Sequence, residues 1–229
     1  MALVIDLAQV QTEIHPTDPV DGNTDDGRSL DRQHPAAPSP SPPSNSTGPG
    51  AKTLSVFLVR NISNAAAVRA DILTSAANES KGASGSDKSV DAAFIDASLI
   101  PSLAVLRSAA AMTCQTLPAL KTKTIHAELV WSLSGNRHIG RALSTFGVQD
   151  MSRDVLVAKF DATEAELEEL RGRVEGDKVE GLEAVEAALR EVCDTAKVKK
   201  VYGIHDAELE IGNLEEAVVG RIAARDCAV

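Results

Sequence analysis

Basic side chains gather on both sides of a short turn, Ser134–Asn136, and residues of these types could bind phosphate groups. Lysine and arginine neutralise phosphate charge, and the free backbone N–H groups at the start of a helix add hydrogen-bond donors. The candidate contacts are Lys121, Lys123, Asn136, Arg137, His138 and Arg141. If these side chains converge, they form a nucleic-acid site. The alternative is a solvated turn with ordinary helix caps.

The residue types that serve most catalytic and metal sites are scattered along the chain. No two histidines have metal-ligand spacing on one predicted element, so we expect no metal and no cofactor. Cys114, Cys193 and Cys227 have no paired spacing, which argues against a disulfide framework and fits a reducing compartment. A catalytic thiol would need a neighbouring base, and none is apparent. The sequence therefore predicts no enzyme.

Charge is distributed unevenly along this acidic chain, whose net charge is −10. Residues 121–160 hold six basic and three acidic side chains, whereas residues 161–195 hold four and twelve. Phosphate neutralisation needs clustered cations, so nucleic acid could bind only at a small local site. The acidic stretch is a solvated face or a docking surface for a basic partner.

The first residues carry no sign of export or membrane insertion. They lack a basic segment, and Asp6 interrupts their short apolar run. We therefore expect no signal peptide, no membrane contact and a location in the cytoplasm and nucleus.

The elements around the turn are predicted from local patterns. His126–Leu133 is apolar and rich in strand-forming types, which predicts a strand. Asn136 is placed to cap a helix, and Gly147 to end it with a positive φ. Between them apolar residues recur at helical spacing: Ile139, Ala142, Leu143 and Phe146.

The remaining chain alternates between strand and helix patterns. Further strands are predicted at residues 2–8, 53–60, 155–160 and 198–203, and an ambiguous apolar run lies at 93–100. Further helices are predicted from Asn61 or Ser63 to about Ala77, and at residues 101–117, 163–172, 181–193 and 212–225. The sequence thus predicts a single α/β domain, in which a mixed β-sheet of about five strands packs with about six helices in two or three layers.

One segment interrupts this pattern. Residues 15–50 are rich in Pro, Ser, Gly and Asp, and cannot bury enough apolar surface to offset their conformational entropy. We predict a disordered insert between the first strand, in residues 1–14, and the rest of the domain, residues 51–229. A proline-rich ligand for a recognition module is the alternative.

Several blocks together resemble one protein family. Around the turn the matching residues are Glu128, Leu133, Ser134, Asn136, Ile139, Ala142, Leu143, Phe146, Gly147 and Val148. Elsewhere they are Lys121–Thr124, Val174–Gly176, Val198–Tyr202, Ile211, Gly212, Ala217, Arg221 and Asp226. The chain resembles the TPRKB family, the small subunit of the KEOPS (EKC) complex that binds the kinase-like subunit PRPK. It departs from the family pattern at Gly135, Arg137 and His138.

The resemblance implies a non-catalytic subunit with two binding surfaces. A helical face would dock on PRPK, and through it on the threonylcarbamoyl transferase subunit; we assign to it Leu214, Ala217, Val218, Arg221 and Ile222. Leu214, Val218 and Ile222 also form a stripe that could equally be core. The basic side chains around the turn would hold the 3′ end of tRNA, and Ile139, Leu143, Phe146 and Gly147 would be a structural signature.

Two other functions stay open from the sequence. One is a small α/β ligand-binding protein or acyl-transfer enzyme, which would need a deep pocket lined by perturbed titratable groups. The other is an adaptor for the kinase that makes no tRNA contact.

Overall fold

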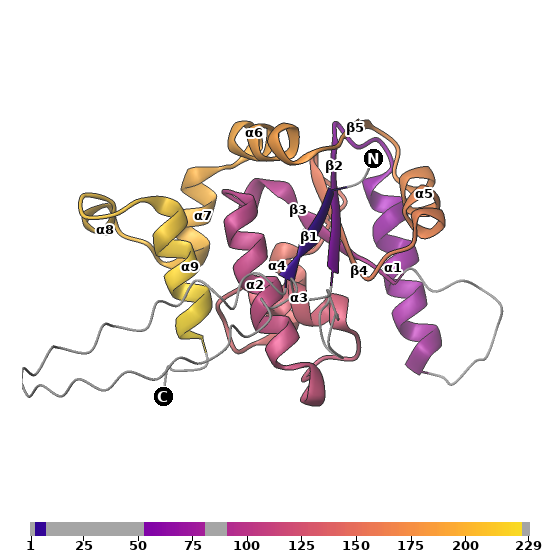
Figure 1. Cartoon of the computed structure of the whole chain (residues 1–229), viewed down its shortest axis with the longest axis horizontal. Coiled ribbons are helices and arrows are strands. Elements are labelled where there is room, and N and C mark those ends of the chain that lie inside the picture. The colour runs from indigo at the N-terminus through magenta and orange to yellow at the C-terminus, as the bar shows by residue number, and fades with distance from the viewer. Residues whose placement is uncertain (1–2, 8–52, 81–90, 226–229) are drawn as a thin grey trace, which may run out of the picture.

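A five-stranded sheet forms the centre of the computed structural model, which describes residues 3–7, 53–80 and 91–225 (Figure 1). The strands are β1 (Leu3–Asp6), β2 (Thr53–Arg60), β3 (Ala93–Asp96), β4 (Val155–Phe160) and β5 (Asp177–Val179). Their order is β1-β2-β4-β3, and β5 pairs with β2 beyond the stretch that pairs with β1. Each of these pairings is antiparallel, so the sheet is not the mixed one expected.

Helices cover both faces of the sheet. The α-helices are α1 (Ala65–Ser80), α2 (Leu103–Gln115), α3 (Ile125–Leu133), α4 (Ile139–Phe146), α5 (Glu164–Arg173), α6 (Leu182–Val192), α7 (Thr195–Tyr202), α8 (Asp206–Leu209) and α9 (Leu214–Ala224). Short 3₁₀ turns lie at Ala97–Leu99 and Leu117–Ala119. In Figure 1, α1 and α5 lie on one side of the sheet and α2, α7 and α9 on the other.

The alternation of side chains along β2 divides the core in two. Leu54, Val56 and Leu58 face the larger cluster, to which α2, α3, α4, α6, α7 and α9 contribute. Phe57 and Val59 face a smaller cluster under α1 and α5. The result is a three-layer α/β domain, which confirms the predicted fold class.

Local capping signals predicted several helices correctly. The Thr163 side chain accepts from the Glu166 N–H and the Glu166 carboxylate accepts from the Thr163 N–H, which forms the capping box that starts α5. Ser102 likewise caps α2. The start of α1 differs, because neither Asn61 nor Ser63 caps it and the helix begins at Ala65.

The predicted strand at His126–Leu133 is wrong, because this segment is α3. Thr124 caps the helix, its Oγ1 accepting the Ala127 N–H at 3.1 Å. Most of its side chains are buried, so the apolar residues show no helical period. Short apolar runs of this kind cannot be assigned by periodicity alone.

The predicted strand at 198–203 is also a helix, α7. Asp194 accepts the Lys197 N–H at 2.9 Å at its start. Gly203 ends it with φ 63°, in the left-handed region. The strand count still agrees with expectation because β3, in the ambiguous run, and β5 replace these two segments.

Part of the predicted domain organisation lies outside the described residues. Of the first segment the structure describes residues 3–7, where β1 pairs with β2 and Leu3 lies opposite Val56. The predicted insert, residues 15–50, falls outside. No helix in the described part of the chain is long and apolar enough to span a membrane.

Candidate functional site

The turn between α3 and α4 is held by its own side chains. The Ser134 hydroxyl donates to the Trp131 carbonyl at 2.7 Å and accepts from the Asn136 N–H at 3.1 Å. Asn136 Oδ1 accepts the His138 N–H at 2.9 Å. Asn136 therefore shapes the turn, whereas the position that caps α4 is His138, whose side chain makes no capping bond. The prediction of Asn136 as the helix cap is corrected accordingly.

The turn rests on two later helices. The Tyr202 hydroxyl of α7 donates to the Leu133 carbonyl at 2.6 Å, in a buried position. Gly135 adopts φ 57°, and a Cβ on it would lie 3.1 Å from the Arg221 carbonyl oxygen of α9. Glycine is needed here for both its backbone conformation and this close approach. The two candidate surfaces, the basic turn and α9, are thus neighbours.

The signature helix α4 has one buried and one exposed side. Ala142 and Phe146 are buried, and the Phe146 ring meets the Tyr202 ring edge-on at 5.6 Å. Ile139 is half-buried and Leu143 is exposed.

Gly147 ends α4 with φ −69°, so the predicted positive φ is wrong. A Cβ there would lie 2.6 Å from the Leu143 carbonyl oxygen, which explains the glycine by space instead.

The charged candidates for phosphate contact are exposed, while Asn136 is half-buried. Lys121 Nζ lies 5.1 Å from the centre of the Trp131 ring, in the last turn of α3. Arg137, His138 and Arg141 lie beyond the turn, at the start of α4. The fold therefore brings Lys121 onto the helix that leads into the turn.

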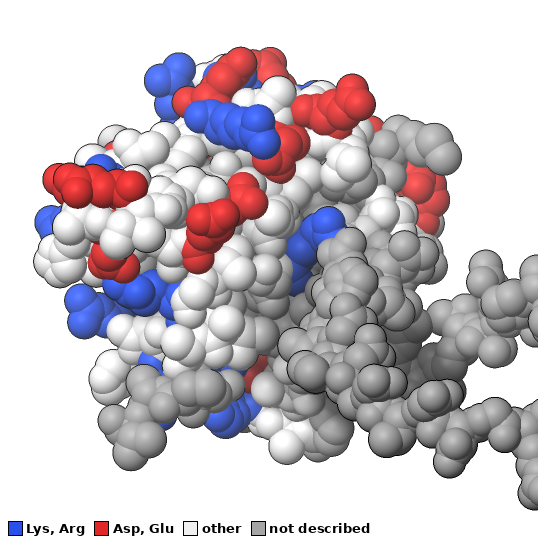
Figure 2. Space-filling view, turned by 60° about the vertical axis from the view of Figure 1, so that its left-hand side comes forward, with Lys and Arg blue, Asp and Glu red and all other residues white. Residues whose placement is uncertain are grey.

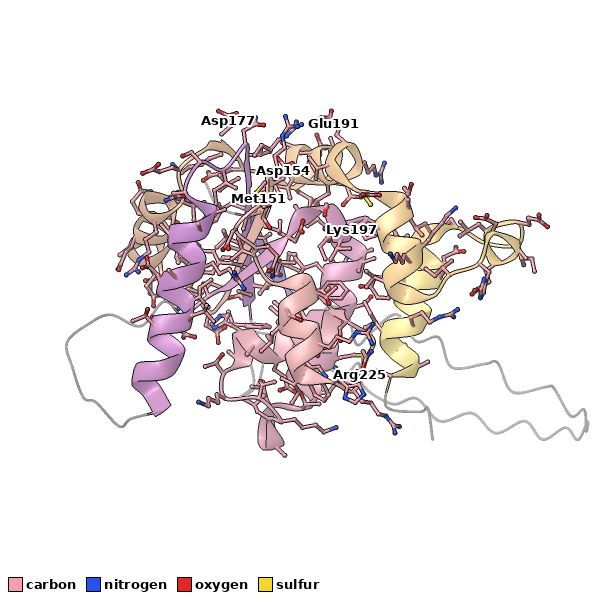
Figure 3. The ribbon with its side chains drawn as sticks, turned by 180° about the vertical axis from the view of Figure 1, so that it is seen from behind. Met151, Asp154, Asp177, Glu191, Lys197 and Arg225 are labelled. Carbon is pink, nitrogen blue, oxygen red and sulfur yellow. The ribbon has the colours of Figure 1, made fainter. Side chains whose placement is uncertain are left out.

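Two buried residues that the sequence analysis did not assign to the site support this region. Glu128 Oε2 accepts from the Thr122 N–H at 2.9 Å and from the Thr122 hydroxyl at 2.7 Å, which holds the segment that carries Lys121 and Lys123. Arg225, at the end of α9 (Figure 3), lies 4.1 Å over the Trp131 ring and donates to Ser132 Oγ at 3.1 Å. Glu128 is among the residues that match the family pattern, whereas nothing in the sequence indicated a role for Arg225.

Trp131 is the only tryptophan of the chain and, by residue type, could stack on a nucleic-acid base. It is only 2% exposed, and cations lie over its ring. In this structure it is a packing residue that links α3 to the end of α9.

The residues assigned to kinase binding divide into two groups. Val218 and Ile222 are fully buried in the larger core cluster. Leu214, Ala217 and Arg221 are half-buried, and the Arg221 guanidinium donates to both carboxylate oxygens of Glu208, at 3.0 and 2.8 Å. Val218 and Ile222 thus hold α9 in place from within, and the other three are the side chains that reach the surface.

The buried histidine of α3 has a structural environment. His126 Nδ1 lies 2.6 Å from Asp91 Oδ1, and Nε2 accepts the Phe160 N–H at 3.0 Å. This hydrogen bond from His126 is the main cause that lowers the pKa of Asp91. Burial raises the pKa of the Cys193 thiol, which is the opposite of what a nucleophilic cysteine needs. Within the described ranges no three His, Cys, Asp or Glu side chains could hold a metal ion.

Comparison with known proteins gives this arrangement a family. The model of the family described as "Kinase binding protein CGI-121" matches residues 59–226, which include the turn and α9. The chain belongs to this CGI-121 family. The resemblance to TPRKB is confirmed, since that name appears among the family's relatives.

Curated relatives of this CGI-121 family protein come from fungi and fish. The "EKC/KEOPS complex subunit cgi121" of Aspergillus fumigatus is 30% identical over 189 residues, 77% of this chain and 92% of the relative. Its namesake in Schizosaccharomyces pombe is 30% identical over 175 residues, 74% and 91% of the two chains. The "EKC/KEOPS complex subunit TPRKB" of Danio rerio is 31% identical over 111 residues, 48% and 61%.

Proposed function

We propose that this protein is a non-catalytic accessory subunit of an EKC/KEOPS complex in the cytoplasm and nucleus. It binds the PRPK-like kinase subunit and supports the modification of tRNA to threonylcarbamoyladenosine. The observation that carries the proposal is the match to a kinase-binding family over most of the folded domain, residues 59–226. Relatives that align over three quarters of the chain are named as subunits of this complex.

The surface of α9 and its approaches bind the kinase in this proposal. Leu214, Ala217 and Arg221 reach the surface on a helix fixed by its own buried residues. A rigid helical face loses little conformational freedom on binding, which favours affinity.

The basic turn holds the 3′ end of tRNA in this proposal. Its charged side chains are exposed, so they can contact phosphate groups without any rearrangement of the hydrophobic core. Because Trp131 is buried, binding rests on phosphate contacts and falls steeply as salt rises. The same burial favours the second candidate, an adaptor that binds the kinase without touching tRNA.

Two assays test the proposal. The protein is first passed over a size-exclusion column with its cognate PRPK-like kinase; co-elution at micromolar concentration is expected. The ATPase activity of the kinase is then measured with and without the subunit and tRNA, and a change on addition of the subunit is expected. Absence of a complex would overturn the proposed function.

Charge reversal separates tRNA contact from kinase binding. The variant Lys121→Glu, Lys123→Glu, Arg137→Glu should lose tRNA binding and keep the kinase. A matched control reverses three exposed cations elsewhere, Arg107→Glu, Lys178→Glu and Lys200→Glu, with the same change in net charge. If both variants bind tRNA equally, the adaptor function stands instead.

A further inference from the structure

The loop between α8 and α9 presents an apolar side chain to solvent. Ile211 is 94% exposed, whereas most large aliphatic side chains of the described chain are packed in the core. Figure 1 shows α8 and this loop extending from the body of the domain, beyond α9. A single exposed apolar residue is common on protein surfaces, so its meaning depends on how it is held and what surrounds it.

Hydrogen bonds fix the backbone of this loop. The N–H groups of Ile211 and Gly212 both point to the Glu208 carbonyl, at 3.4 and 3.1 Å. A capping box between Asn213 and Glu216 starts α9, and at the start of α8 the Glu208 carboxylate accepts the His205 N–H at 3.0 Å. The backbone that carries Ile211 is therefore already ordered, so less conformational entropy is lost when a partner binds this side chain.

Arg221 ties the loop to the surface of α9. Its guanidinium donates to both oxygens of Glu208, so the base of the loop is joined to the helix that carries the proposed kinase contacts. Ile211 therefore extends the α9 surface that is proposed above to bind the kinase.

The side chains around Ile211 are acidic. Between residues 205 and 216 the sequence has five acidic side chains and no lysine or arginine: Asp206, Glu208, Glu210, Glu215 and Glu216. Two of them pair with cations from neighbouring helices, Asp206 with Lys199 and Glu208 with Arg221, so the cluster keeps a net negative charge. Figure 2, which turns this end toward the viewer, shows clusters of acidic side chains interspersed with basic ones on the upper part of the face. Hydrogen bonding to the His205 backbone lowers the pKa of Glu208, which keeps its carboxylate ionised at neutral pH. An apolar tip with an acidic border is complementary to an apolar pocket bordered by lysine or arginine.

We propose that Ile211 is an anchor for the kinase subunit and inserts into an apolar pocket with a basic rim on that protein. This inference rests on the proposed function and adds a specific contact to it. The acidic border steers the kinase onto the tip, and Arg221 keeps the loop in register with α9. Neither contact involves a side chain of the basic turn.

The test measures the Kd of the full-length subunit for the purified kinase by calorimetry. Ile211→Ala removes most of the apolar surface of the tip and should weaken binding about tenfold or more. The matched control is Met151→Ala, which truncates another highly exposed apolar side chain, 91% exposed, well away from the α8–α9 end in Figure 3. This control should change the Kd less than twofold, and both variants should keep the parental melting temperature.

A second variant tests the acidic border. Glu210→Lys should slow association, with a smaller effect at high salt, because steering between exposed charges is screened. If the parent binds the kinase and Ile211→Ala binds it within twofold, the anchor is overturned while the proposed function stands. If the unmodified subunit does not bind the kinase, both the proposed function and the anchor role of Ile211 are overturned.

Discussion

The α3–α4 turn and the α8–α9 loop are both short connections beside α9, but they are held in different ways. The turn rests on buried groups: the Tyr202 hydroxyl, the close contact of Gly135 with α9, and the Phe146 ring below. The loop is held by helix caps and by an ion pair between partly exposed side chains, Arg221 and Glu208. Buried contacts therefore support the α3–α4 turn, whereas partly exposed contacts support the α8–α9 loop.

This difference separates binding from stability. Changes beneath the turn should unfold the domain, whereas changes in the loop should alter binding and leave the fold intact. Mutational phenotypes at the two places will therefore differ in kind, even where both reduce complex formation.

The largest effect is expected from Phe146→Ala. Phe146 is 1% exposed, so its loss leaves a cavity and should lower the free energy of unfolding by about 3–5 kcal/mol. Ile211→Ala in the exposed loop should change it by less than about 0.5 kcal/mol. Urea denaturation of both variants measures the contrast. Equal stabilities would show that the turn is not supported from below.

The next effect concerns the contact between the turn and α9. Gly135 and Gly203 have similar left-handed φ angles, 57° and 63°, but a Cβ on Gly203 meets nothing within 4 Å. Gly203→Ala therefore measures backbone strain alone, about 1–2 kcal/mol. Gly135→Ala adds the clash with the Arg221 carbonyl and should cost more. The extra loss of unfolding free energy in Gly135→Ala, relative to Gly203→Ala, measures the packing of the turn on α9. Equal losses in the two variants would contradict that contact.

A smaller loss is expected from Tyr202→Phe. The substitution removes the hydroxyl that donates to the buried Leu133 carbonyl and should cost about 1–2 kcal/mol, because the carbonyl is left unpaired. Burial also raises the pKa of Tyr202, so the hydroxyl stays protonated and able to donate at any physiological pH. Thermal unfolding monitored by circular dichroism checks the value; a variant as stable as the parent would mean that water replaces the hydroxyl.

Local sequence signals predicted those parts of the fold that depend on few neighbouring residues. The capping box at Thr163 and Glu166 is complete within four residues, so α5 could be read directly. Residues 53–60 were likewise predicted as a strand, and β2 is buried on both faces, each face in a different core cluster. In these elements local preference and tertiary packing agree.

The failures have a common physical cause. In α3, tertiary burial covers nearly the whole helix, so the apolar residues at 126–133 lose their helical period and resemble a strand. The capping residue Thr124 is present in the sequence, but the strand-forming residue types at 126–133 favoured the prediction of a strand. In α7 the cap at Asp194 and the glycine at 203 were also present and were outweighed in the same way.

The candidate site could be predicted only as a set of residues. Sequence spacing selected the basic side chains but could not bring the turn against Arg221 or place Arg225 over Trp131, because these contacts join distant segments. Nor could it divide the stripe on α9, where Val218 and Ile222 proved to be core. Each of these facts depends on long-range packing.

The smallest effect sharpens the comparison through pH. Hydrogen bonding to the His205 backbone is the main cause that lowers the pKa of Glu208 below that of an ordinary glutamate, with Arg221 contributing. Because the pKa of Glu208 is lower in the folded than in the unfolded state, its ionised carboxylate stabilises the folded loop. This stabilisation is complete at a pH above the unfolded-state pKa, and it is lost as the pH falls through the folded-state pKa. The groups that contact the α3–α4 turn directly are a hydroxyl, a carbonyl and a glycine, and none of them is a carboxylate. Acid should therefore loosen the loop while the turn stays in place.

Amide chemical shifts of Gly212 and Gly135, followed by NMR from pH 7 to pH 3, measure this difference directly. The Gly212 N–H, which donates to the Glu208 carbonyl, should shift with a midpoint below the pKa of an ordinary glutamate, and the Gly135 N–H should not follow it. Glu208→Gln, which cannot ionise, should abolish that titration of Gly212 and leave Gly135 unchanged. A parallel titration of both amides would mean that the two connections form one cooperative unit, and the kinase and tRNA surfaces would then respond to acid together.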